Sequence, residues 1–166
     1  MAFNQMIKVL NIFLKKLYRY SGYLAAFFLI LVAVFILIGV FSRLFGFYIR
    51  GLAEYSGYCM AASTFFALAF TFSEGGHIRI TLFLEKMNFK IKKIFEIWCL
   101  FVGSFFSGFL AFYFTKMLII SFKFQERSEG ADEILIWIPQ IPVAIGSSIL
   151  FICLLHHLIL KVSKNV

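Results

Sequence analysis

Three histidines are the residues best suited to cofactor chemistry in this chain. A membrane haem needs axial histidines that face one another across neighbouring helices. His77 follows the second long apolar run of the sequence, whereas His156 and His157 lie near the end of the last one. These positions indicate imidazoles at a membrane surface, in contact with headgroups or a carboxylate, and not a haem pair. The sequence therefore predicts no cofactor.

Ionisable residues within the apolar runs would indicate ion or proton transport, because charge at the centre of a bilayer is costly and is usually functional. Glu54, Glu96 and Lys116 each lie within a few residues of the end of an apolar run, and the first run has no ionisable residue. Small proton-coupled efflux pumps need an embedded carboxylate, and a self-sufficient transporter needs helices interrupted near the midplane. The HExxH, P-loop and GxSxG motifs are absent. The sequence thus favours neither an enzyme nor a transporter that works alone.

The cysteines could in principle bind metal. Cys59, Cys99 and Cys153 form no CxxC pair and all fall within apolar runs. We interpret them as buried thiols that pack like small apolar side chains, and we predict no metal site.

The composition indicates which elements must position these residues. Hydrophobic residues make up 62% of the chain and charged residues 14%, against about 45–50% and about 25% in soluble domains. A helix that crosses the hydrocarbon core, about 30 Å thick, needs about 20 apolar residues. Four runs approach that length, at about 21–41, 52–72, 95–119 and 138–160, and they are apolar all round. We predict an all-α integral membrane protein with four transmembrane helices in a single domain, residues 1–166.

Lysine and arginine predict the orientation of these spans. Eleven of the 16 basic residues lie before the first span, between the second and third, or after the fourth, and five lie on the other side. The positive-inside rule therefore places both termini in the cytoplasm. The net charge of +8 is concentrated at the ends of apolar runs, which suits anionic lipid headgroups better than nucleic acid.

Two segments beside the spans have an amphipathic pattern. Asn4, Lys8, Asn11, Lys15 and Arg19 share one face of an N-terminal helix, and residues 84–95 show a similar pattern. Each segment is expected either to lie along the headgroup layer as an interfacial helix or to extend the adjacent span.

The fourth span has a distinctive beginning. Trp137 suits the interfacial aromatic belt, and Pro139 and Pro142 follow it. Because proline disfavours helical conformation in the preceding residue, we expect Ile138 and Ile141 to lie outside the helix interior.

Small residues in the third span are suited to helix contacts. Gly103 with Ser107, and Ser104 with Gly108, form two overlapping small-xxx-small pairs. Such pairs let helix backbones approach closely. Internal packing and a partner helix would both use this face.

Several motifs occur together in one order along the chain. Glu54 opens the second span and is followed by Phe65, Phe66 and Ala67; "GGHIRI" at 75–80 ends that span; and "IPQIPVAIG" at 138–146 begins the fourth. With the four-span plan, these motifs resemble the small membrane subunit of tripartite ATP-independent periplasmic (TRAP) transporters. The resemblance extends over nearly the whole chain, although the loop before the fourth span is unusually charged.

The resemblance implies a place in the bacterial cytoplasmic (inner) membrane and two protein partners. A large membrane subunit would carry the substrate and sodium sites and move by an elevator mechanism, and a periplasmic binding protein would deliver an organic acid. The small subunit would pack beside the immobile scaffold of the large one. A stand-alone small transporter or channel, and a membrane anchor for a redox complex, are the alternatives.

Residue roles follow as hypotheses. Arg43 and Glu54 are expected to pair near the outer interface, with a structural or functional role. His77 and Arg79 would lie at the cytoplasmic interface, where Arg79 would meet a lipid phosphate or a partner helix. Trp137, Pro139, Pro142 and Gly146 are structural or interface candidates. The outer loop would either dock the binding protein by charge or be merely solvated; its charged residues are Glu126, Arg127, Glu129, Asp132 and Glu133.

Overall fold

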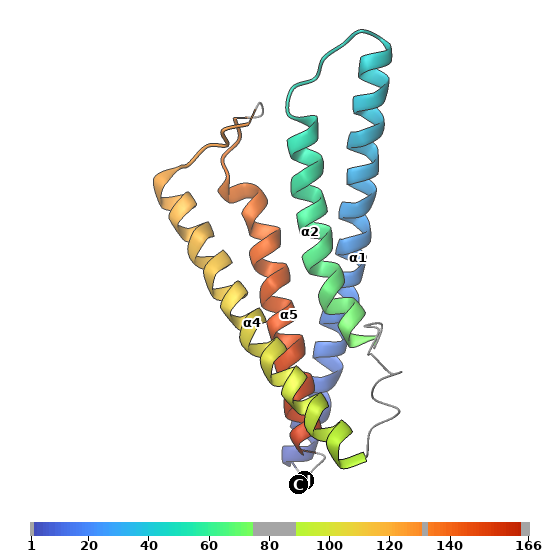
Figure 1. Ribbon diagram of the computed structural model, residues 1–166, viewed down its shortest axis with the longest axis vertical. Coiled ribbons are helices and arrows are strands. Elements are labelled where there is room, and N and C mark those ends of the chain that lie inside the picture. The colour runs from blue at the N-terminus through green and yellow to red at the C-terminus, as the bar shows by residue number, and fades with distance from the viewer. Residues whose placement is uncertain (1, 75–88, 131–132, 164–166) are drawn as a thin grey trace.

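The described part of the chain is built from helices. The computed structural model describes residues 2–74, 89–130 and 133–163. Within these ranges lie α1 (Ala2–Leu44), α2 (Leu52–Ser73), α4 (Phe89–Phe124) and α5 (Trp137–Ser163), as Figure 1 shows. The β-type pairing in the described residues is an isolated bridge between Arg127 and Leu135. The predicted all-α class is confirmed.

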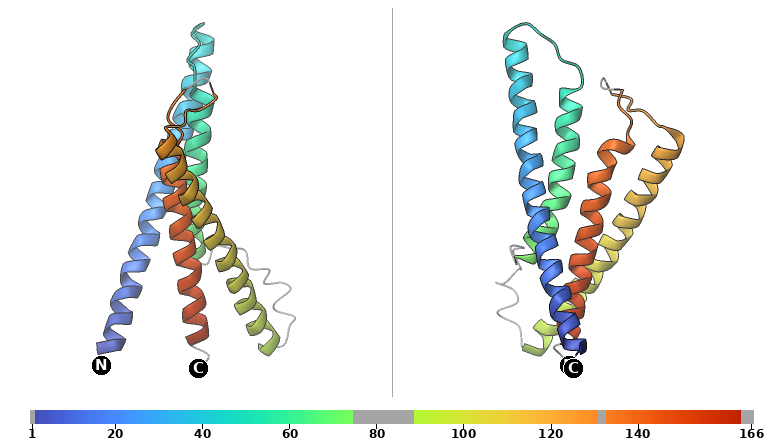
Figure 2. Two further views of the ribbon diagram at one scale, coloured as in Figure 1. Left: turned by 90° about the vertical axis from the view of Figure 1, so that its left-hand side faces the viewer. Right: turned by 180° about the vertical axis from the view of Figure 1, so that it is seen from behind.

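The four helices form two antiparallel hairpins that lie side by side. α1 packs along α2, α4 packs along α5, and α2 and α5 join the hairpins, so that the helices follow one another across Figure 1 in the order α1, α2, α5, α4. α1 also meets α5, in a much smaller contact. Figure 2 shows that α1, α5 and α4 diverge toward the end that carries both termini. We call this the terminus end and the opposite end the loop end.

Three of the described helices are long and apolar enough to cross a membrane. They contain the segments Asn11–Leu44, Ile91–Phe124 and Trp137–Val162, and they correspond to the first, third and fourth predicted spans. α2 is not among them. Its 22 residues would extend about 33 Å, but Ser, Thr, Gly and Tyr residues lower its hydropathy.

Two helices are much longer than the spans predicted from the sequence. α1 has 43 residues, which at 1.5 Å each extend about 65 Å. The N-terminal amphipathic segment is therefore the first part of α1 and not a separate helix, which favours the second of the two expectations. α4 begins at Phe89, and the first part of the 84–95 segment lies outside the described residues.

α5 begins earlier than the prolines suggested. The helix starts at Trp137 and includes both Pro139 and Pro142, so Ile138 and Ile141 lie within its first five residues, near its start and not in its middle. The amides of the first turn have no helical partner, so Pro139 removes no hydrogen bond. Pro142 removes the bond to the carbonyl of Ile138, a loss that the long apolar helix tolerates.

The buried core is small and lies where α1, α2 and α5 meet. Its fully buried or nearly buried side chains include Tyr18, Phe66, Ala69, Leu150 and Cys153. Much of the remaining large apolar surface is exposed along α1 and α4. Lipid tails are as apolar as these side chains, so helix association here depends on close packing and hydrogen bonds between helices.

Candidate functional site

The chemistry that the described residues offer is that of helix contacts. They contain no group of three or more His, Cys, Asp or Glu side chains placed to hold a metal ion. Cys153 is buried, Cys59 is partly buried and Cys99 is exposed. The expectation of a buried thiol is thus wrong for Cys99, which is exposed on α4.

The two hairpins approach closely at Gly146 of α5. A Cβ atom at this position would lie 2.8 Å from the Phe65 Cβ, 3.1 Å from the Phe65 carbonyl carbon and 3.2 Å from the Phe66 amide nitrogen of α2. The Phe65 ring meets the Phe114 ring of α4 edge to face, with centroids 5.2 Å apart. Glycine at 146 therefore lets α2 and α5 pack with their backbones in contact, and Phe65 extends the contact to α4.

The small residues of the third span lie against α5. Ser104 and Ser107 are buried, and a Cβ at Gly103 would lie 3.8 Å from Leu154. A Cβ at Gly108 would lie 2.9 Å from the Phe151 ring. Of the two uses that the sequence left open for this face, the structure shows internal packing.

A polar cluster joins α1 to α5 near the terminus end. His156 Nε2 lies 2.7 Å from Asn11 Oδ1, and His156 Nδ1 lies 3.4 Å from the Tyr18 hydroxyl. An amide oxygen only accepts, so Nε2 carries the proton and donates to Asn11, while Tyr18 donates to Nδ1. Tyr18 is itself 1% exposed. We call Asn11, Tyr18 and His156 the polar cluster.

Sequence reasoning missed the polar cluster. It expected the histidines to contact headgroups or a carboxylate, whereas the partners of His156 are an amide and a phenol of α1. His157 donates from Nδ1 to the Cys153 carbonyl at 2.8 Å, and its ring packs edge to face on Phe72. The spacing of Asn11 and Tyr18, seven residues apart on one helix face, was the available signal.

Two further contacts strengthen this end of the molecule. Lys161 of α5 forms an ion pair with Glu96 of α4. The Ser21 hydroxyl donates to the Tyr18 carbonyl at 2.8 Å and lies 3.2 Å from the Phe66 carbonyl of α2. The terminus end is therefore held by polar groups from all four helices.

Arg43 and Glu54 lie close together at the loop end. Both line a cavity of about 60 Å³ formed by the end of α1, the connecting turn and the start of α2. Gly51, with φ of 82°, precedes α2 in this turn, in a conformation that favours glycine. The structure thus brings the two residues to one place, and an ion pair between them stays a prediction.

The described residues of the charged outer loop lie next to α2. Ser128 donates its amide to the Ile134 carbonyl at 2.7 Å, and Ile136 donates to the Glu126 carbonyl at 3.0 Å. The Ser128 hydroxyl lies 3.1 Å from the Tyr58 hydroxyl of α2. The loop therefore has a defined position over the gap between the hairpins.

The loop charges differ in their surroundings. The carboxylate of Glu126 accepts a hydrogen bond of 2.7 Å from the Ser121 hydroxyl, which ties it to the end of α4. Arg127, Glu129 and Glu133 are exposed. Asp132 lies outside the described residues, as do His77 and Arg79.

Trp137 closes the α4–α5 hairpin at the loop end. Its ring meets the Phe122 ring edge to face, with centroids 5.3 Å apart. Trp137 thus anchors the start of α5 against α4, at the level where an interfacial aromatic belt is expected.

These observations define a helical membrane protein with several long spanning segments, whose polar residues connect its own helices. Residues 32–164 match the family model described as "Tripartite ATP-independent periplasmic transporters, DctQ component". The chain belongs to this family, and the resemblance predicted from its motifs is confirmed. Comparisons with curated proteins and with solved structures gave no match. Members of this family are components of transporters. Membership implies a tripartite complex with a large membrane subunit and a binding protein.

Proposed function

We propose that this chain is the accessory membrane subunit of a TRAP-type secondary transporter in a bacterial inner membrane. It packs as a scaffold against the large subunit, which takes up an organic acid together with sodium after a periplasmic binding protein delivers it. The family match over residues 32–164 is the observation that carries this proposal.

The placement of charges supports a fourth span at α2. Glu54 and Glu74 bracket an uncharged stretch of α2, just as Arg19 and Arg43 do in α1 and Glu96 and Lys116 do in α4. The stretch between the two acids of α2 would extend about 28 Å, which is close to the hydrocarbon thickness of about 30 Å. Because α2 packs between α1 and α5, these two helices shield part of the polar surface of α2. With α2 spanning, the positive-inside rule places the terminus end in the cytoplasm.

The scaffold role agrees with the chemistry of the spans. The central part of each predicted span has no ionisable residue, so the ion and substrate sites are assigned to the large subunit. The exposed apolar faces of α1 and α4 offer a wide surface to lipid or to partner helices.

Reconstituted transport tests this assignment. Proteoliposomes that contain this chain and its large partner should accumulate an organic acid when the binding protein and an inward sodium gradient are present. Vesicles with either membrane subunit omitted should not accumulate it above background. Uptake by this chain alone, or full uptake by the large subunit without it, would contradict the proposal.

Charge reversal in the outer loop tests docking of the binding protein. A Glu129→Lys, Glu133→Lys double variant should slow uptake, and the defect should depend on ionic strength, because salt screens the interaction between exposed charges. Arg50→Glu, an exposed change in the α1–α2 turn, is the control for a general effect of outer charge. Unchanged uptake by the double variant at low salt would show that the loop is only solvated.

A further inference from the structure

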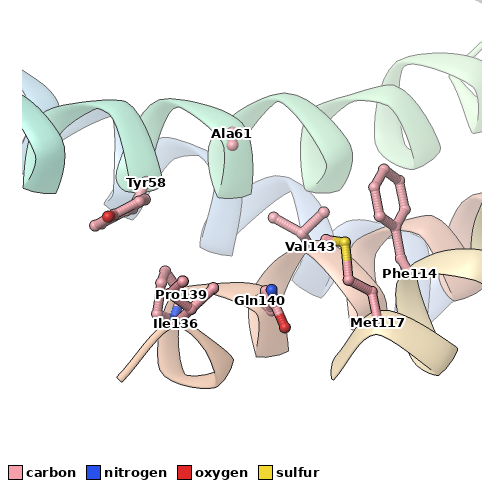
Figure 3. Close-up of a pocket in the computed structure, with 8 residues that line it drawn as sticks. All are labelled: Tyr58, Ala61, Phe114, Met117, Ile136, Pro139, Gln140 and Val143. Atoms are coloured by element: carbon pink, nitrogen blue, oxygen red, sulfur yellow. The ribbon is translucent and has the colours of Figure 1, made fainter. Parts of the chain in front are cut away.

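An apolar cavity lies between the two hairpins near the loop end. Its volume is about 240 Å³, and it is partly open to the surroundings. Figure 3 shows the residues that line it: Tyr58 and Ala61 of α2, Phe114 and Met117 of α4, Ile136 just before α5, and Pro139, Gln140 and Val143 at the start of α5. All three helices that meet across the gap therefore contribute to its walls.

The packing of the hairpins explains why this space stays unfilled. Toward the middle of the molecule, the Phe65 ring of α2, whose backbone lies against Gly146, meets the Phe114 ring of α4. This contact closes the space between α2 and α4 on that side. Toward the loop end, the contact between the Tyr58 and Ser128 hydroxyls connects α2 to the outer loop. Between these two contacts, Ala61 and Val143 are too small to fill the remaining space.

The lining of the cavity is almost entirely apolar. In Figure 3, Tyr58 and Gln140 lie nearer the loop end than Phe114, and Met117 lies near Phe114. The buried Gln140 Oε1 has no hydrogen-bond partner among the described residues. Trp137, the aromatic residue suited to the membrane interface, begins the helix that forms the floor. The end of the cavity beside Tyr58 and Gln140 thus lies toward the interface, and the end beside Phe114 lies toward the bilayer interior.

We propose that this cavity binds one acyl chain of an outer-leaflet phospholipid. An empty apolar cavity forfeits dispersion contacts along its lining, and the surrounding bilayer supplies acyl chains as the apolar molecules that can restore them. The tail lies against Met117, Phe114 and Val143, and the glycerol region lies toward the loop end, beyond Tyr58 and Gln140. The inference rests on the membrane placement proposed above and not on the transport role.

Photo-crosslinking tests the site in the purified complex of this chain with its large subunit, reconstituted in lipid nanodiscs. One phospholipid probe carries a diazirine within an acyl chain and a second carries it on the headgroup. After irradiation, the acyl probe should label peptides that contain Met117 and Val143 more strongly than peptides from the exposed face of α1. The headgroup probe should not show this enrichment at Val143.

Filling the cavity should displace the lipid. Ala61→Phe, and independently Val143→Phe from the opposite wall, should reduce acyl labelling of the Met117 peptide several-fold. Met60→Phe is the matched control, since Met60 is the neighbour of Ala61 and is 62% exposed. Either filling variant that still co-purifies with the large subunit is sufficient for the test.

Three results would overturn the proposal. Labelling at the cavity no stronger than on the α1 face would show ordinary bilayer contact. Labelling that is unchanged in both filling variants would place the lipid elsewhere. Crosslinks from a photoreactive residue at Met117 to the large subunit, and none to lipid, would assign the cavity to a partner side chain. None of these outcomes requires transport activity, so the test is separate from that of the proposed function.

Discussion

A Gly146→Ala variant should be clearly less stable than the native chain. The added Cβ would meet the Phe65 Cβ at 2.8 Å and two backbone atoms of α2 at 3.1 and 3.2 Å, and a backbone cannot rotate aside as a side chain can. Overpacking of this kind costs about 1–3 kcal/mol. Removing a helical glycine returns up to about 1 kcal/mol, so the steric term wins. We expect a net loss of about 1–2 kcal/mol in the free energy of unfolding, measured by SDS titration in mixed micelles with circular dichroism.

Two other glycines provide a graded control. A Cβ at Gly57 of α2 meets no atom within 4 Å, so Gly57→Ala should leave the unfolding free energy unchanged or raise it. A Cβ at Gly108 would approach the end of the Phe151 ring at 2.9 Å, and this ring can shift, so Gly108→Ala should fall between the two. Equal stability of the Gly146 and Gly57 variants would show that the α2–α5 contact is looser than described.

The helices themselves could be predicted because the signal that specifies them is local. A continuous uncharged run such as 21–41 is apolar whatever the neighbours are, and its length can be compared with the bilayer thickness. Helix ends were less predictable. α1 and α4 continue well past their apolar runs, since amphipathic sequence can remain helical in the headgroup layer and beyond.

Helix pairing could not be predicted in the same way. In a soluble protein the buried face differs in polarity from the exposed one, but here Leu29 at 60% exposed and Leu150 at 9% are the same residue type. Small residues gave partial information: Gly103 and Ser107 indicated a contact face without naming its partner. Gly146 was recognised from a motif, but its packing against Phe65 depends on the angle between the hairpins.

The polar cluster was missed for a related reason. Asn11 and His156 are separated by 145 positions, and each residue is unremarkable within its own helix. Their meeting depends on α1 extending past its apolar run and reaching α5. The loop charges were visible in the sequence, whereas the tie between Glu126 and Ser121 follows from the way α4 ends at Phe124.

A His156→Leu variant should loosen α1 from α5 at the terminus end. The substitution removes the acceptor of the Tyr18 hydroxyl and the donor to Asn11 Oδ1. Losing a hydrogen bond to a buried polar group costs about 1–3 kcal/mol, and Tyr18, almost fully buried, would keep only its weaker contact with the Cys153 thiol. We expect the unfolding free energy to fall by about that amount. Spin labels at Lys16 and Ile159, which are both exposed, should report a broader distance distribution between the two helices.

A double-mutant cycle separates the hydrogen bond from a general effect of losing the imidazole. Asn11→Ala and His156→Leu should be non-additive, with a coupling energy within the range of about 0.5–3 kcal/mol that contacting residues show. His157→Leu is the matched control, because His157 donates within α5 and packs on Phe72 of α2; it should show no coupling to Asn11 and no broadening of the α1–α5 distance. Because α1 and α5 share little other contact, the hydrogen bond should matter to their association. Additive effects of the Asn11 and His156 substitutions would show that it does not, and that packing alone holds the helices together there.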